Sequence, residues 1–223
     1  MAYVISMIVV LVVFVPLGIY LEGRRKNAWN QVAELLQLDA EPLGKDMSYH
    51  LSGIYREVDV VAWYQEIPRG RETERSTFLG VRLYDPIWQD LILEPLGLGG
   101  RLMNQITGAR GITIDDEEFD RTHNITGRVH EGTYRALRDE LVQRQFRGLK
   151  NSFSRYWMKD GVIFVEQDGD MLDADRLVRL LDRLVDRAKV LDGWAARNLH
   201  VGQITADVAP APELAPLGEG VIW

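Results

Sequence analysis

The sequence predicts an α+β protein with one N-terminal transmembrane helix, followed by a soluble domain of antiparallel strands packed with helices. Three observations predict it. Residues 3–21 form a run of nineteen residues without a charge. Asp160-Gly161 separates two runs rich in β-branched and aromatic residues, and this dipeptide is a strong signal of a β-hairpin turn. Residues 174–191 place apolar side chains at alternating steps of four and three, which indicates an amphipathic helix.

The N-terminal run, YVISMIVVLVVFVPLGIYL, predicts a membrane anchor over residues 1–22. A helix rises about 1.5 Å per residue, so this run covers nearly the whole hydrocarbon thickness of a bilayer. The alternative is a cleaved signal peptide, which needs a basic segment ahead of a shorter apolar stretch and small residues before the cut. No Lys or Arg precedes the run, so the sequence favours the anchor.

Residues 23–44 are predicted to hold a basic cluster and an amphipathic helix. Arg24, Arg25 and Lys26 directly follow the apolar run. By the positive-inside tendency these charges place the soluble domain in the cytoplasm and the anchor in the inner membrane. They are also predicted to contact anionic headgroups at the membrane surface. Apolar residues from Trp29 to Leu38 recur at helical spacing until Pro42 and Gly44 end the helix.

Residues 45–197 are predicted to form the soluble α+β domain, and residues 198–223 a flexible tail rich in Ala and Pro. Two runs favour a long hairpin with a charged loop, and three shorter runs favour further strands. A helix, a hairpin and a closing helix should follow. In order, the predicted elements are the hairpin Gly53–Ile67 and Thr77–Leu83 with loop Pro68–Arg75, strands Leu91–Leu93, Ile112–Ile114 and His123–Val129, helix 134–149, hairpin 153–167 and helix 174–191.

Composition excludes several classes of site. The chain has no cysteine, so thiolate metal centres and cysteine nucleophiles are excluded, and its net charge of −7 argues against nucleic acid as a partner. The glycine-rich stretch 95–101 lacks the residues of a phosphate-binding loop. The acidic stretch 168–175 lacks the glycine and glutamate of a calcium loop and is better explained by capping of the last helix, with a weak calcium site left as the alternative. No catalytic, cofactor-binding or metal-binding residue is assigned.

The segment from Ile112 to Leu191 resembles a loose group of uncharacterised bacterial membrane-anchored proteins. The resemblance rests on Ile112, Ile114 and the motif Glu118-Phe119-Asp120-Arg121 ahead of a helix-hairpin-helix segment, and it covers about a third of the chain. The group usually has an apolar residue shortly after its Phe-Asp pair, where this chain has His123. The resemblance implies membrane anchoring and no particular activity.

These observations predict a membrane-tethered cytoplasmic interaction domain, a scaffold or accessory subunit of a membrane complex with the bilayer and an unidentified protein as partners. The apolar residues Val221, Ile222 and Trp223 are the candidate docking segment for that partner. A concentration of Arg and Lys between Arg135 and Lys159 is either a solvated surface or a contact for anionic lipid or an acidic partner. The alternative function is a membrane-anchored hydrolase that uses Asp120 and His123.

Overall fold

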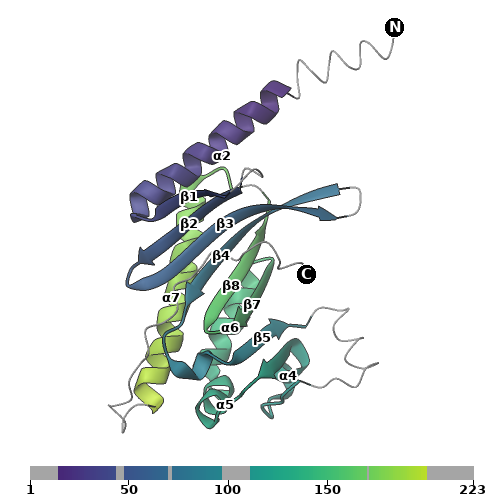
Figure 1. The fold of residues 1–223 in the computed structure, drawn as a ribbon. Helices are drawn as coiled ribbons and strands as arrows, with labels where there is room; N and C mark the ends of the chain where they lie inside the picture. Colours follow the sequence, from purple (N-terminus) through teal and green to yellow (C-terminus); the bar gives the residue numbers. More distant parts are fainter. Residues whose placement is uncertain (1–14, 44–47, 70–71, 97–110, 170, 200–223) are drawn as a thin grey trace.

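A computed structural model describes residues 15–43, 48–69, 72–96, 111–169 and 171–199. These residues form an α+β fold, as predicted, in which helices pack against a large antiparallel sheet (Figure 1). Within these ranges no helix combines the length and the apolarity that crossing a membrane requires. Most of the predicted span, residues 1–14, lies outside the described residues.

The described strands form one eight-stranded sheet in the order β1-β2-β3-β4-β8-β7-β5-β6. Every neighbouring pair is antiparallel, and β4 pairs with β8 at its centre, so the N-terminal and C-terminal halves of the chain share one sheet. The strands are β1 (Asp39–Leu43), β2 (Ser48–Tyr55), β3 (Val58–Arg69), β4 (Glu72–Arg82), β5 (Leu91–Pro95), β6 (His123–Gly127), β7 (Arg155–Lys159) and β8 (Val162–Asp168).

The helices lie on one side of the sheet, and α6 and α7 run behind the strands in the view of Figure 1. Their apolar faces and the alternate residues of the strands form one core cluster, which includes Trp29 of α2, Phe146 of α6 and Leu184 of α7. The helices are α2 (Val15–Leu36), α4 (Glu117–Thr122), α5 (Glu131–Arg138), α6 (Glu140–Ser152) and α7 (Ala174–Leu199), with a short 3-10 turn, η2 (Pro86–Trp88).

Helix α2 joins two segments that the sequence suggested separately. It begins at Val15, inside the predicted span, and continues without a break to Leu36. Its second half packs Trp29 and Val32 into the core, whereas Ile19 and Tyr20 near its start are 70% and 59% exposed. The basic residues that follow the apolar run therefore lie on a helix that is continuous with the packed core of the domain. The strand β1 that follows was not predicted.

The predicted strand Gly53–Ile67 is wrong, because the chain turns within it. Arg56 and Glu57 have φ of 50° and 66° and connect β2 to β3. Such a two-residue turn usually carries Asn or Gly, and this one carries neither, so its signal is missing from the sequence. The predicted loop Pro68–Arg75 is also too long, since β3 continues to Arg69 and β4 begins at Glu72.

The segment between β5 and α6 contains more helix than was predicted. Ile112–Ile114 is not a strand, although the Ile112 N–H donates to the Ile125 carbonyl at 2.8 Å. The acidic residues after it form α4, because Asp116 caps the helix by accepting from the Phe119 N–H at 2.9 Å. The predicted helix 134–149 is two helices, since Asp139 is extended (φ −77°, ψ 130°) and caps α6.

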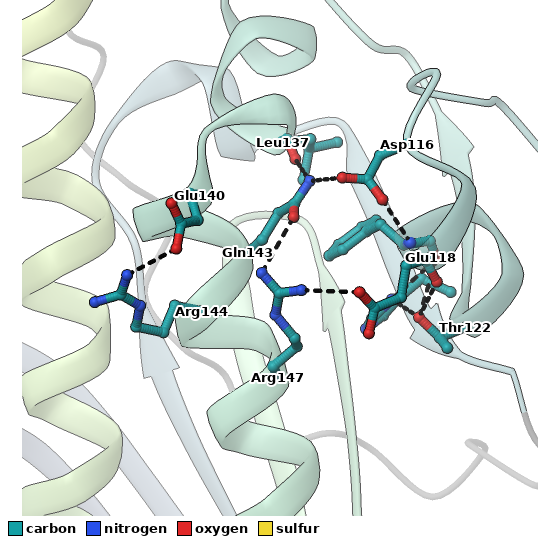
Figure 2. A network of polar contacts seen from close by, with 10 residues as sticks. Asp116, Glu118, Thr122, Leu137, Glu140, Gln143, Arg144 and Arg147 are labelled. Carbon is teal, nitrogen blue, oxygen red and sulfur yellow. Dashed lines mark hydrogen bonds and ion pairs between the residues drawn. The ribbon is translucent and has the colours of Figure 1, made fainter.

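A buried glutamine ties these helices together. Gln143 donates to Asp116 at 2.8 Å and to the Leu137 carbonyl at 3.0 Å, and it accepts from Arg147 at 3.3 Å (Figure 2). Arg147 also pairs with Glu118 at 3.4 Å. The network joins the cap of α4 to α5 and α6. Its hydrogen bonds satisfy buried polar groups that would otherwise lack a partner.

The two strongest predictions are confirmed. Asp160 and Gly161 take φ of 52° and 71° and connect β7 to β8 as a hairpin. The closing helix is α7, and it is longer than predicted, reaching Leu199. Asp173 accepts from the N–H groups of Asp175 and Arg176 at 3.0 and 3.3 Å, which confirms that it caps this helix.

Candidate binding face

The two faces of the sheet carry different side chains because successive strand residues point to opposite sides. Leu79 and Val81 of β4 are fully buried against the helices, within the core cluster. Phe78 of β4 and Val61 of β3 point to the other face and are 6% and 7% exposed, yet neither belongs to that cluster. The sheet therefore has a helix-covered face and a second face, here called the open face.

Four aromatic rings from four neighbouring strands pack together on the open face. Trp63 of β3 stacks on Phe78 of β4, with ring centroids 5.0 Å apart and an interplanar angle of 12°. Trp157 of β7 stacks on Phe164 of β8 at 5.4 Å and 21°. The two pairs meet edge to face, at 77° between Trp63 and Phe164 and 70° between Phe78 and Trp157. We call these four residues the aromatic cluster; three of them, all but Phe78, are partly exposed.

Gly80 makes room for this cluster. A Cβ atom at Gly80 would lie 2.7 Å from a methyl of Val61 and 3.1 Å from two ring atoms of Phe164. Both side chains thus occupy the space above the glycine: the distance to Val61 is too short for a real Cβ atom, and the distance to Phe164 is unusually short. The ring of Phe164 can cross β4 only because residue 80 has no side chain.

Charged residues border the aromatic cluster along β7 and β8. Glu166 is 3% exposed, accepts a hydrogen bond from the Ser76 hydroxyl at 2.7 Å and lies 3.6 Å from Arg155. Arg155 and Lys159 flank Trp157 on the same side of β7, and both are exposed. The cluster is therefore bordered along β7 by two cationic side chains that reach solvent.

His50 lies at the β2 edge of the open face, where its Cα pairs with Trp63 on one side and with Glu41 on the other. It is 4% exposed, and its Nδ1 atom has no hydrogen-bond partner among the described residues. Burial lowers the pKa of His50 from its ordinary value, against an opposing effect of the Glu41 carboxylate. The ring is thus held neutral beside the aromatic cluster.

A polar hollow of about 570 Å³ lies where β4, β7 and β8 meet at one end of the sheet. It shares Arg155 with the border of the aromatic cluster. Its lining combines both signs of charge and shows no preference for an anion or a cation. The lining residues are Thr73, Glu74, Arg75, Ser154, Arg155, Asp168 and Gly169.

The predicted membrane-contact residues take two different positions. Arg24 and Lys26 are exposed on α2. Arg25 turns inward: it is 4% exposed, pairs with Glu22 at 2.6 Å and places its guanidinium 4.1 Å from the ring centroid of Tyr64. The headgroup contact stays a prediction, and only the two exposed cations have the access that it needs. The predicted docking residues, Val221, Ile222 and Trp223, lie outside the described residues.

Asp120 and His123, the candidates for the hydrolase, have structural partners. An Asp120 carboxylate oxygen accepts from the Ile114 N–H at 3.0 Å. His123 is 3% exposed, stacks on Phe119 with centroids 4.0 Å apart and hydrogen-bonds through Nε2 with the Tyr156 hydroxyl. Burial lowers the pKa of His123 to about 4. A substrate has no access to this ring, and two residues of the motif Glu118-Phe119-Asp120-Arg121 make structural contacts, Phe119 by stacking and Asp120 by its hydrogen bond.

The acidic segments likewise show structural roles. Asp116, Asp139 and Asp173 cap helices. In the part of the chain that the structure describes, no group of three or more His, Asp or Glu side chains is placed to hold a metal ion. The glycine-rich stretch 97–100 lies outside the described residues.

Comparison with known proteins adds little. No family model and no curated protein matches the chain. Among solved structures, the chain is similar to the crystal structure of the mycobacterial trehalose monomycolate transport factor A, TtfA, with 11% identity and a TM-score of 0.44 over 79% of this chain and 94% of that chain. A likeness this distant carries no argument about function.

The aromatic cluster was missed by the sequence reasoning, although a signal for it exists. The β8 segment Val162-Ile163-Phe164-Val165 is apolar at every position, whereas a strand with one solvated face alternates apolar and polar residues. Val60-Val61-Ala62-Trp63 of β3 shows the same pattern. Such runs indicate strands that are covered on both faces.

Proposed function

We propose that this protein is a membrane-tethered scaffold or accessory subunit whose cytoplasmic domain binds a partner protein of the same membrane through the open face. The observation that carries the proposal is the aromatic cluster, an apolar surface on the side of the sheet opposite the helices. Apolar patches that reach the surface mark interaction sites, and three of these rings are partly exposed. Trp is enriched where binding energy concentrates.

The tether is supported by the sequence and by α2. The uncharged run 3–21 leads into α2, whose first described turns expose Leu17, Ile19 and Tyr20. Apolar side chains on a helix that projects beyond the sheet (Figure 1) are more stable in lipid than in water. Since α2 continues into the core, its exposed first turns have a fixed direction relative to the domain.

The partner's chemistry follows from the border of the aromatic cluster. Apolar side chains would cover Trp63, Trp157 and Phe164, while acidic side chains beside them would meet Arg155 and Lys159. Antiparallel sheets accept an amphipathic helix or an extended segment on an apolar face. The fitting partner is therefore an apolar segment with acidic flanks.

The proposal is tested by affinity capture of the full chain from membranes in a mild detergent, with three proteins compared. The wild type and Arg144→Glu, an exposed change on α6, should retain the same partner protein. Trp157→Ser should lose it at least fivefold while its circular dichroism stays native, because the ring that anchors the contact is gone. Sedimentation of each membrane fraction in alkaline carbonate tests the tether, and the chain should stay with the pellet.

Two results would overturn the proposal. One is a wild-type chain that elutes alone and monomeric at every protein concentration tested. The other is a partner recovered equally with Trp157→Ser, which would place the contact elsewhere on the molecule. Release of the chain by carbonate would remove the membrane tether and leave only the interaction domain.

A further inference from the structure

We propose that the chain's own segment Ala209–Trp223 covers the aromatic cluster when the partner is absent, so that tail and partner compete for the open face. This inference rests on the proposed function, because it takes the open face to be the partner's binding surface. The tail is then the partner's competitor, and the partner binds by displacing the tail.

The composition of the segment matches the chemistry of the face. Ala209–Trp223 contains three prolines, at positions 210, 212 and 216, and the apolar end Val221-Ile222-Trp223. Proline-rich segments adopt an extended helix without internal hydrogen bonds and bind surfaces lined by aromatic rings at low entropic cost. The aromatic cluster offers three partly exposed rings, on β3, β7 and β8, packed around the buried ring of Phe78.

Charge is complementary as well. Residues 200–223 carry Asp207, Glu213 and Glu219 and no Lys or Arg. Among the described residues, Lys159 and Arg155 border the aromatic cluster and reach solvent, Arg155 lying also 3.6 Å from Glu166. A segment with prolines and Leu214 around Glu213 can set apolar groups on the rings while its carboxylate meets these cations.

The tail is long enough to reach the aromatic cluster from the end of α7. Leu199, the last residue of α7, packs against Gly132 and lies near Ile87 of η2. This is the end of the sheet at which the β7–β8 turn lies, since the Leu83 N–H donates to the Gly161 carbonyl at 2.7 Å. Trp157 is four residues along β7 from that turn, roughly 13 Å at the rise of a strand. The chain from Leu199 to Pro210 spans up to about 35 Å when extended, enough to round the sheet end.

The test uses the purified full chain in detergent with the photo-cross-linker benzoylphenylalanine at Leu217. Mass spectrometry of the monomer band should find cross-links to peptides of β3, β4, β7 and β8. The variant Lys159→Glu combined with Arg155→Gln leaves the rings in place and should lower this yield at least threefold. The control Arg144→Glu, on the helix side, should leave it unchanged, and thermal unfolding checks that all variants fold.

Three outcomes would overturn the inference: cross-links to α2 or α7 instead of the open face, cross-links only in a dimer band, which would make a second copy the occupant, or a yield insensitive to the charge changes. Partner capture separates this inference from the proposed function. Removing residues 208–223 should raise the amount of partner protein recovered at least threefold. If the intramolecular cross-link forms and no partner is captured by either chain, the proposed function fails and the tail contact stands.

Discussion

The two faces of the sheet are built from neighbouring residues of the same strands and differ in what completes them. On the helix-covered face, Met158 and Leu79 are fully buried by α6 and α7. On the open face, Trp157 and Phe78 each stand one residue earlier in the same strands, and their rings pack against other aromatic rings. The comparison teaches that apolar content alone does not make a core: the helix-covered face is closed by packed helices, whereas the open face leaves aromatic rings partly exposed.

The largest difference in stability is expected between substitutions of Met158 and of Trp157. Met158→Ala should destabilise the domain by about 3 kcal/mol, because it leaves a cavity in a packed interior. Trp157→Ala, one residue earlier, should cost only about 1 kcal/mol, since the ring is partly exposed and loses chiefly its aromatic contacts. Urea unfolding of the full chain in detergent, followed by circular dichroism, measures both. Equal losses would show that the two faces are equally part of the core.

Acid should destabilise the domain mainly through His123, on the helix-covered face. Its pKa is about 4 in the folded protein, against an ordinary value of 6.5, because burial disfavours the charged ring. Above pH 6.5 both states are neutral and this stability is intact. As the pH falls from 6.5 to 4 the unfolded state binds a proton that the folded state excludes, so stability should fall by about 3 kcal/mol. His50 should add a contribution of the same sign, since burial also lowers its pKa.

Urea unfolding at several pH values measures this dependence, with His123→Phe as the matched variant. The phenylalanine keeps the stacking on Phe119 and cannot titrate, so the variant should lose most of the slope between pH 6.5 and 4. A slope that survives the substitution would assign the acid sensitivity to another group.

A methyl group at residue 80 probes how tightly the open face is packed. Gly80→Ala should destabilise the domain by about 2 kcal/mol, because the added carbon meets Val61 at 2.7 Å and the Phe164 ring at 3.1 Å. The near-ultraviolet circular dichroism of Trp63 and Trp157 should change with it. Gly193→Ala in α7, where the nearest atom is the end of the Arg197 side chain at 3.2 Å, is the control and should be neutral or slightly stabilising. An unchanged aromatic signal in Gly80→Ala would mean that the rings do not depend on this glycine.

The smallest effect concerns the polar network behind the helix-covered face. Asp116→Ala should cost about 1 kcal/mol, because it removes the cap of α4 and a partner of Gln143. Arg144→Ala, which breaks an exposed pair with Glu140 in the same region (Figure 2), should change stability by less than about 0.5 kcal/mol. Thermal unfolding of both variants tests the difference. Equal changes in the unfolding temperature of the two variants would show that the contacts of the buried Gln143 do not stabilise the domain.

The sequence by itself determined the α+β class, the β7–β8 hairpin and the closing helix. Each rests on a local signal: the positive φ that Asp160-Gly161 accommodates, and the apolar stripe of α7. The cap at Asp173 also follows from local chemistry, since its side chain binds N–H groups two and three residues ahead. Local signals suffice where the interacting atoms are near in sequence.

Tertiary structure alone decided where the chain turns without a turn residue and which residues meet. Arg56 and Glu57 adopt positive φ because the strands on either side pair in register, and Gln143 meets Asp116 only because the fold brings α4 beside α6. The aromatic cluster unites residues from Trp63 to Phe164 through the pairing of β4 with β8, which joins two halves of the chain. No local pattern encodes that register, because it depends on packing energies summed over the whole sheet.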